Sequence, residues 1–123
     1  MRILLADSQP RVRFALRVLM AQQPGVTDVA EMADAAALVA ELHAEQADLL
    51  LLDWDLPGLA EAGGLRALRQ VAPQLGVVCL SGRPGARRAA LAAGADAFVS
   101  KSDPPERLVD AVRRCSGRQS RTD

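Results

Sequence analysis

The sequence predicts an α/β fold, a three-layer sandwich in which one parallel sheet lies between two layers of helices. The first observation is that short apolar runs alternate five times with segments of helical periodicity along 123 residues. The second is composition: half of the residues are hydrophobic and only 2% are aromatic. Such a composition suits an aliphatic sheet covered by helices, and the length suits one domain.

The first β-then-α repeat begins almost at the N-terminus. Residues 3–6 form an apolar run that ends at Asp7, and Pro10 is well placed at the first position of a helix. Pro24-Gly25 closes that helix, and residues 26–30 are predicted as the second strand. The order strand, turn, helix therefore starts at residue 3.

The remaining elements follow in strict alternation. They are a helix over residues 35–44, a strand over 49–52, a helix over 65–71, a strand over 77–80, a helix over 86–93, a strand over 95–99, and a helix from Pro104-Pro105 through Val112. Parallel strands joined by right-handed helical crossovers place helices on both faces of the sheet. The favoured topology is the flavodoxin-like order 2-1-3-4-5, with residues 1–117 as the domain and 118–123 as a polar tail or linker.

Charge and cysteine usage narrow the class of protein. Fifteen basic and fifteen acidic residues cancel, which argues against a domain that holds nucleic acid by phosphate neutralisation alone. Cys79 and Cys115 lie in apolar patterns without a nearby Cys or His, so neither a zinc site nor a disulfide is indicated. The N-terminal apolar run is too short for a signal peptide or a membrane span. We expect a cytoplasmic protein without membrane attachment.

Polar side chains follow four of the predicted strands. In an open α/β sheet, functional groups gather beyond the carboxyl ends of the strands where the strand order reverses. Asp7 and Asp53 end the first and third strands, Ser81 ends the fourth and Lys101 the fifth, and Asp55 lies two residues beyond Asp53. Clustered carboxylates repel each other unless a cation lies among them, so the sequence predicts a Mg²⁺ site with Asp53 as ligand and nucleophile.

Three segments carry a resemblance to a known family. Residues 49–58, 80–82 and 93–101 resemble the acceptor strand, the switch Ser/Thr and the Lys strand of receiver domains of two-component response regulators. The resemblance implies that Asp53 accepts a phosphoryl group from a histidine kinase, with Mg²⁺ held by Asp7, Asp53 and the backbone carbonyl of Asp55. It also implies that Ser81 and Lys101 bind the phosphoryl oxygens. Ser81 and Phe98 would then move together and repack the face formed by the fourth helix, fifth strand and fifth helix, which also suggests a homodimer through that face.

The sequence departs from the family pattern near the acceptor. Ser8 stands where the family usually has a second acid, which weakens the expected Mg²⁺ site and favours Ser8 as a helix-start residue rather than a ligand. The loop 58–63 is longer than in the family. Ser102 stands where many receivers have Pro, a feature of receivers attached to helix-turn-helix transcription modules of the LuxR/NarL type. The resemblance thus implies a C-terminal DNA-binding output domain that is absent from this chain.

Asp55 has two possible uses. Its side chain either replaces the carboxylate missing at Ser8, or pairs with Arg83 across the mouth of the site and hinders the water that hydrolyses the acyl phosphate. For Phe98, a switch role and a plain core role are equally supported. These alternatives stay open at the level of sequence.

Two other functions compete with the phosphorylation switch. The first is a pseudo-receiver used for docking without phosphorylation, motivated by Ser8. The second is a phosphatase of the haloacid dehalogenase type, because Asp53-Trp54-Asp55 matches its Asp-x-Asp motif. That motif belongs on a first strand, whereas here it ends the third. Whether the chain is an enzyme is left open; it catalyses at most its own phosphorylation and dephosphorylation.

Overall fold

A computed structural model describes residues 1–120 of the chain, with side-chain surroundings through residue 116. The elements in chain order are β1 (Arg2–Ala6), α1 (Pro10–Ala21), β2 (Asp28–Met32), α2 (Ala35–Ala44), β3 (Leu49–Asp53), α3 (Gly64–Val71), β4 (Gly76–Ser81), α4 (Ala86–Ala92), β5 (Ala97–Ser100) and α5 (Pro105–Ser120). The five strands are parallel in the order β2-β1-β3-β4-β5, which confirms the predicted topology.

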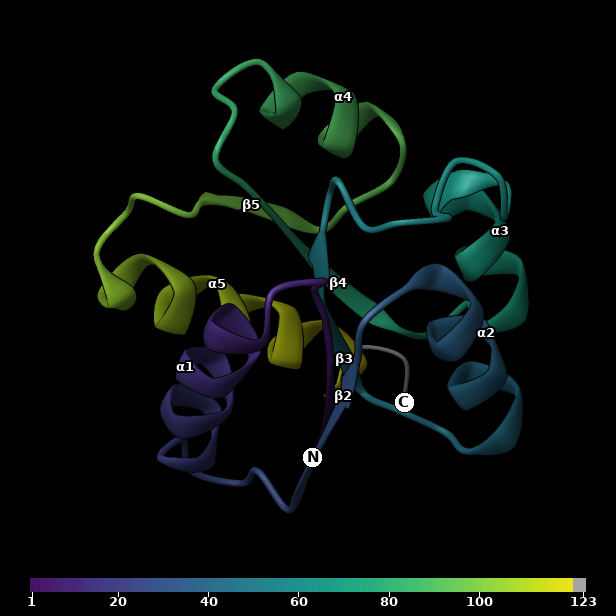
Figure 1. The fold of residues 1–123 in the computed structure, drawn as a ribbon. Helices are drawn as coiled ribbons and strands as arrows, with labels where there is room; N and C mark the ends of the chain where they lie inside the picture. The colour runs from purple at the N-terminus through teal and green to yellow at the C-terminus, as the bar shows by residue number, and fades with distance from the viewer. Residues whose placement is uncertain (121–123) are drawn as a thin grey trace.

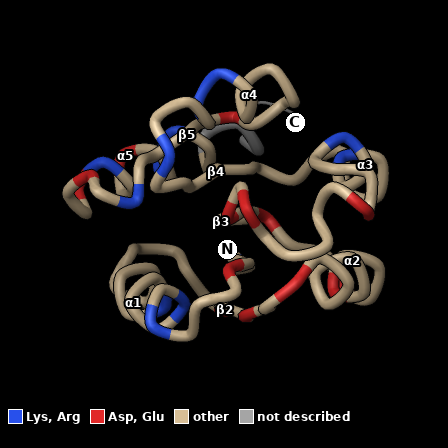
Figure 2. Tube along the Cα trace, turned by 45° about the horizontal axis from the view of Figure 1, so that its top comes forward, with Lys and Arg blue, Asp and Glu red and all other residues tan. Residues whose placement is uncertain are grey.

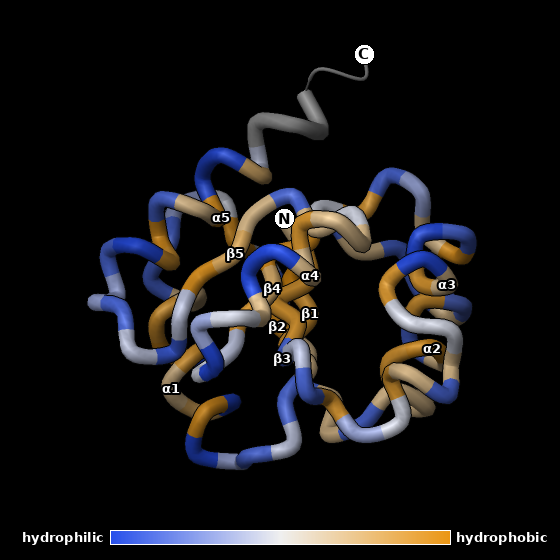
Figure 3. Tube along the Cα trace, turned by 90° about the horizontal axis from the view of Figure 1, so that it is seen from above, coloured by the Kyte–Doolittle hydropathy of each residue, from blue (hydrophilic) through white to orange (hydrophobic). Residues whose placement is uncertain are grey.

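The helices form two layers around the sheet (Figure 1). α1 and α5 lie together on one face, and α2 and α3 lie on the other, with α4 beside β5. The core divides in the same way. One buried cluster joins the sheet to α2, α3 and Ala90 of α4, and the other joins it to Met20 of α1 and to α5. In Figure 3, hydrophobic residues of the strands occupy the centre of the domain.

β3 is the central strand, and all of its residues are buried. Leu49, Leu50, Leu51 and Leu52 are all 0% exposed. Both faces of this strand are covered by helices, which explains the uninterrupted apolar run. The strand therefore holds Asp53, its last residue, at a fixed place on the sheet edge.

Three element boundaries differ from the sequence-based expectation. β2 was expected over 26–30 but begins two residues later, because its register starts with Arg2 opposite Asp28. β5 was expected over 95–99 but covers Ala97–Ser100, since the amide of Asp96 still pairs with the Val77 carbonyl in the turn. α5 continues to Ser120, past residue 118, where the polar tail was expected to begin.

The extension of α5 puts the first three residues of the expected tail, 118–120, in the helix. Arg, Gln and Ser are all compatible with a helix, so loss of apolar periodicity does not end it. The remainder of that tail, 121–123, lies outside the described residues. Within the described range, no helix combines the length and the apolar character needed to cross a membrane.

Candidate functional site

The carboxyl edge of the sheet carries the buried polar side chains. Among the described residues these are Asp7, Asp53 and Ser81, which are 1%, 5% and 1% exposed. β1 and β3 are neighbours with Ala6 opposite Leu52, so the two carboxylates follow adjacent strands at the same level. Figure 2 shows acidic residues gathered beside β3 near the middle of the domain. The structure thus brings together the residues that the sequence placed at the strand ends.

Lys101 lies between the two buried carboxylates. Its Nζ donates a hydrogen bond to Asp7 Oδ2 at 2.8 Å and lies 3.5 Å from Asp53 Oδ1. Burial lowers the pKa of Lys101, but the hydrogen bond to Asp7 and the charge of Asp53 outweigh this and raise it. The backbone amide of Lys101 also donates to the Ser81 carbonyl at 3.0 Å. The ammonium group is therefore fully charged at neutral pH and held against the acceptor.

A common local arrangement orients the three buried polar side chains. Each one accepts a hydrogen bond from the backbone amide two residues further along the chain. The pairs are Gln9 N to Asp7 Oδ1 at 2.9 Å, Asp55 N to Asp53 Oδ1 at 3.0 Å, and Arg83 N to Ser81 Oγ at 3.0 Å. Such turns fix the rotamer of a short polar side chain. The site is therefore arranged by its own loops before any ligand binds.

The carboxyl group of Asp53 has a raised pKa. Burial is the main cause, and the charges of Asp7 and Asp55 add to it, while the Asp55 amide and Lys101 act in the opposite direction. The ionised form at neutral pH is thus held in a place that disfavours it. A buried, ionised carboxylate of this kind is stabilised when a cation or an electrophile binds beside it.

Replacement of Asp53 by Asn is expected to raise the melting temperature at pH 7 in buffer without Mg²⁺. Because the folded-state pKa exceeds the ordinary value of 3.8, the stability that Asp53 gives when protonated is present below that pH and lost as pH rises through the folded pKa. Asn keeps the neutral form at all pH values, so its advantage should shrink toward acid pH. Thermal unfolding at several pH values measures this, with Asp55→Asn as the exposed control; an unchanged or lower melting temperature at pH 7 contradicts it.

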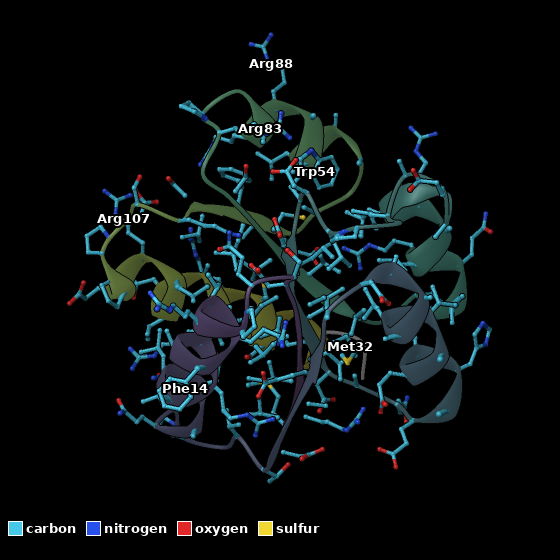
Figure 4. The ribbon with its side chains drawn as sticks, in the orientation of Figure 1. Phe14, Met32, Trp54, Arg83, Arg88 and Arg107 are labelled. Atoms are coloured by element: carbon cyan, nitrogen blue, oxygen red, sulfur yellow. The ribbon has the colours of Figure 1, made fainter. Side chains whose placement is uncertain are left out.

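The Asp55 side chain pairs with Arg83. The guanidinium donates from Nη2 to Asp55 Oδ1 at 2.5 Å and from Nε to Oδ2 at 3.3 Å. The two side chains are 63% and 51% exposed, so the pair lies at the surface. Figure 4 shows Arg83 close to Trp54, beside the acceptor. Of the two uses considered for Asp55, the structure shows the pair across the mouth and does not bring its carboxylate to Asp7.

Ser8 is exposed, and among the described residues its hydroxyl makes no hydrogen bond. The expectation that it starts the helix is wrong: the N-cap of α1 is Gln9, without a side-chain cap, and Pro10 follows. The turn is closed instead by Asp7, whose carboxylate accepts the Gln9 amide. Arg13, which no sequence pattern singled out, donates to the Asp7 carbonyl at 2.7 Å and supports the same turn.

The oxygen donors available here suit Mg²⁺ with a reduced set of protein ligands. In the described part of the chain, no three His, Cys, Asp or Glu side chains are grouped closely enough to hold a metal ion. The Asp7 and Asp53 carboxylates and the Asp55 backbone carbonyl remain. Mg²⁺ commonly keeps several waters and takes one or two carboxylates, so this set fits the ion with fewer charges than usual.

The loop after Asp53 is anchored over the core. Leu56 and Leu59 are 3% and 6% exposed, and Gly58 and Gly63 adopt φ values of +83° and +97°. At Gly63 a Cβ atom would meet the Ala67 Cβ at 2.9 Å, so the turn into α3 requires glycine. The loop noted as long in the sequence is therefore an exposed rim that Leu59 anchors to the core.

Phe98 is half-buried on β5, where it packs against the core cluster that contains Cys79 and Ala90. It also lines a groove over α4, β5 and α5 together with Arg87, Leu91 and Arg107. Cys79 and Phe98 are register partners on β4 and β5, two residues before Ser81 and Ser100. Phe98 thus lies on the strand that pairs with the strand carrying Ser81.

Comparison with known proteins agrees with this geometry. A family model described as the response regulator receiver domain matches residues 3–113. The chain is 35% identical over 116 residues to the transcriptional activator protein ExaE of Pseudomonas putida, covering 93% of this chain and 54% of that protein. It is 31% identical over 114 residues to the nitrate/nitrite response regulator protein NarP of Escherichia coli (strain K12), covering 91% and 53%. The chain spans about half the length of these curated relatives.

Solved structures give the same result. A two-component response regulator of the LuxR family from Aurantimonas sp. SI85-9A1 aligns with a TM-score of 0.84 at 32% identity, covering 94% of this chain and 84% of that one. A CheY-like receiver domain protein from Methanospirillum hungatei JF-1 aligns at 0.86 and 22% identity over 99% and 98%, which shows the fold alone. The Asp-x-Asp motif accordingly begins at the end of the third strand of a receiver fold, whereas the phosphatase motif belongs on a first strand. The chain belongs to the receiver domains of two-component response regulators, with relatives of the LuxR/NarL type.

Proposed function

We propose that Asp53 accepts a phosphoryl group from the phosphohistidine of a histidine kinase and that the resulting acyl phosphate switches the α4–β5–α5 face. The observation that carries this proposal is the placement of Asp53, buried at the end of β3 with the Lys101 ammonium 3.5 Å away. Phosphoryl transfer depends mainly on positioning and on charge neutralisation. Both requirements are supplied here by a rigid strand end and a fixed cation.

In the proposed step, an Asp53 carboxylate oxygen forms a bond to phosphorus while the bond from phosphorus to the histidine nitrogen breaks. The leaving imidazole takes a proton from solvent. Mg²⁺, held by the Asp7 and Asp53 carboxylates and the Asp55 carbonyl, would neutralise charge on the transferred group when bound. Lys101 supplies a second positive charge from the protein.

Ser81 is suited to receive one phosphoryl oxygen. Its Oγ accepts the Arg83 amide, and in the described part of the chain its hydroxyl hydrogen has no acceptor. A buried hydroxyl with an unused hydrogen is stabilised when an anionic oxygen arrives. We infer that this contact draws Ser81 inward and that Phe98 follows through the β4–β5 pairing.

The partners follow from the same proposal. The α4–β5–α5 face, with exposed Leu91 and the arginines of the groove, is proposed as the surface for a homodimer of the phosphorylated form. The relatives are about twice as long, which supports a DNA-binding output domain beyond this chain. Two buried free cysteines support a cytoplasmic location. In this proposal the domain catalyses only its own phosphorylation and dephosphorylation.

Trp54 provides the test. It is the only Trp, it adjoins Asp53, and it packs against the core. We expect its fluorescence to change on addition of Mg²⁺ and then of beryllofluoride or a small phosphodonor, and we expect Asp53→Asn to abolish the second change. The mass of the intact chain should show one phosphoryl adduct that is absent in Asp53→Asn. If neither a fluorescence change nor a phosphoryl adduct is seen under any condition, the pseudo-receiver is favoured.

The pair between Arg83 and Asp55 is expected to prolong the life of the acyl phosphate. The bidentate contact holds the guanidinium group against Asp55, two residues beyond the acceptor, and we infer that it hinders the approach of a hydrolytic water. Arg83→Ala should shorten the lifetime about two- to fivefold, the range that an exposed pair worth up to ~1 kcal/mol allows. Arg88→Ala, which removes an outward-pointing arginine of α4 (Figure 4), is the matched control. A lifetime unchanged by Arg83→Ala, or shortened equally by both variants, would remove this role.

A further inference from the structure

Arg69, in the last turn of α3, joins three segments of the chain. Its Nη1 donates to the Leu75 carbonyl, just before β4. Its Nη2 donates to the Gly94 carbonyl at 2.6 Å and to Asp96 Oδ2 at 2.8 Å, both in the turn between α4 and β5. The same Asp96 oxygen accepts the Val77 amide of β4 at 2.8 Å. One guanidinium group therefore ties the end of α4 to α3 and to the sheet.

Backbone hydrogen bonds close the same end of α4. The Gly94 amide donates to the Leu91 carbonyl at 3.1 Å. The Ala95 amide donates to the Ala90 carbonyl, also at 3.1 Å. Gly94 has a φ of +109°, the left-handed conformation that commonly ends a helix. Because Arg69 binds the carbonyl of this same glycine, the helix cap and the guanidinium group together fix the C-terminal end of α4.

The sides of α4 are held more weakly than those of the other helices. Its buried side chains are Ala86 and Ala90, whereas every other described helix buries at least one larger apolar side chain. A methyl group removes little apolar area from water. Within residues 1–116, no side chain of α4 forms a hydrogen bond or an ion pair. Attachment of this helix therefore depends largely on its C-terminal end.

The N-terminal end of α4 lacks a comparable restraint. Its N-cap, Gly85, makes no side-chain hydrogen bond, and residues 82–85 are all exposed. A Cβ atom added at Gly82 or at Gly85 would meet nothing within 4 Å. The loop contributes the surface pair between Arg83 and Asp55, and the Arg83 amide donates to Ser81 Oγ. This end of the helix is thus joined to Ser81 by a short loop with free space around it.

We propose that Arg69 is a positioning residue that makes the C-terminal end of α4 a pivot. The inference rests on the proposed function: when Ser81 binds a phosphoryl oxygen, the loop after β4 follows it and the N-terminal end of α4 swings about Gly94. The Arg69 contacts are kept in both states, so the movement is confined to one end of the helix. Without these contacts both ends are free, and the position of Ser81 no longer sets the direction of α4.

Amide hydrogen exchange on the full chain without phosphodonor tests the Arg69 contacts. Arg69→Met keeps an apolar stem and removes the donors. It should speed exchange of the Gly94 and Ala95 amides about tenfold or more, because a hydrogen bond from a charged group contributes a factor of this size. Arg66→Met, at an exposed position of the same helix, is the matched control and should leave both rates unchanged. Unchanged rates in Arg69→Met, or rates raised equally by both variants, overturn the proposal.

A milder variant separates a local effect from general loss of stability. Arg69→Lys keeps the charge but cannot reach three acceptors with a planar fork, so it should give a smaller increase at the same two amides. The amides of β3 should exchange at the same rate in every variant. An increase at β3 as large as that at Gly94 and Ala95, in both Arg69 variants, would mean that Arg69 only stabilises the fold and would overturn the pivot.

Amide chemical shifts measured with Mg²⁺ and beryllofluoride test the swing itself. In the unchanged chain, shifts should change over residues 82–88 and stay the same at Gly94 and Ala95. In Arg69→Met they should change at both ends of α4, while the Trp54 fluorescence response persists because Asp53 is intact. Equal shift changes at both ends in the unchanged chain overturn the pivot. Silence of Trp54 in the unchanged chain overturns the proposed function and with it the swing, whereas the exchange rates decide the Arg69 contacts separately.

Discussion

Replacing Lys101 with Met is expected to lower the free energy of unfolding by about 2 kcal/mol at pH 7, somewhat less than the loss for a fully buried pair because the Lys101 side chain is 26% exposed. The reason is that Asp7 and Asp53 would face each other without a cation. The pKa of Lys101 is raised above 10.5 in the folded state, so its contribution is present at neutral pH and is lost as pH rises through that raised pKa. The difference between the two proteins should therefore narrow in alkaline buffer.

Urea unfolding at pH 7 and at alkaline pH measures this effect. Lys101→Arg is the matched control, because it keeps the charge while changing the shape of the donor. Added Mg²⁺ should stabilise Lys101→Met more than it stabilises the unchanged chain, since the ion takes over the neutralisation of the two carboxylates. A Lys101→Met protein as stable as the unchanged chain at pH 7 would show that the ammonium does not hold the two acids together.

Shortening a leucine side chain of the central strand is expected to give the second large effect on stability. Leu50→Ala is expected to destabilise the domain by about 3 to 5 kcal/mol. Leu50 is 0% exposed on a strand paired with both β1 and β4, so the removed side-chain atoms would leave a cavity. Leu91→Ala removes the same atoms at a site that is 39% exposed and should cost less than about 1 kcal/mol. Chemical denaturation of both variants measures the contrast. Equal losses would mean that β3 is less tightly packed than its burial indicates.

The sequence predicts the buried elements better than the edges. The 49–52 run was placed correctly because a strand covered on both faces has an unbroken apolar pattern. β2 is an edge strand with mixed exposure, so its pattern did not reveal that pairing with Arg2 sets its first residue at 28. Cys115 is the last apolar residue of α5 in the sequence, so no periodic apolar residue marks the continuation of the helix to Ser120.

The site residues also differ in how well the sequence predicts them. Asp7, Asp53, Ser81 and Lys101 were predictable because topology alone brings the carboxyl ends of parallel strands together. The direction of Asp55 was not, because it depends on which partner an exposed rotamer finds, and Arg83 lies 28 residues away. Ser8 shows the same limit: its hydroxyl suits a helix start, but the chain turns at Asp7 and α1 begins after Gln9.

The Lys101 bridge also determines when the site becomes electrically neutral. Two carboxylates and one ammonium leave one net negative charge in the resting state. A divalent cation reverses that sign, and conversion of Asp53 to a doubly charged acyl phosphate returns the total to zero. With a further acid at position 8, neutrality would come with the cation alone. With Ser8, metal and phosphoryl group neutralise the site only together, so each should bind more tightly in the presence of the other.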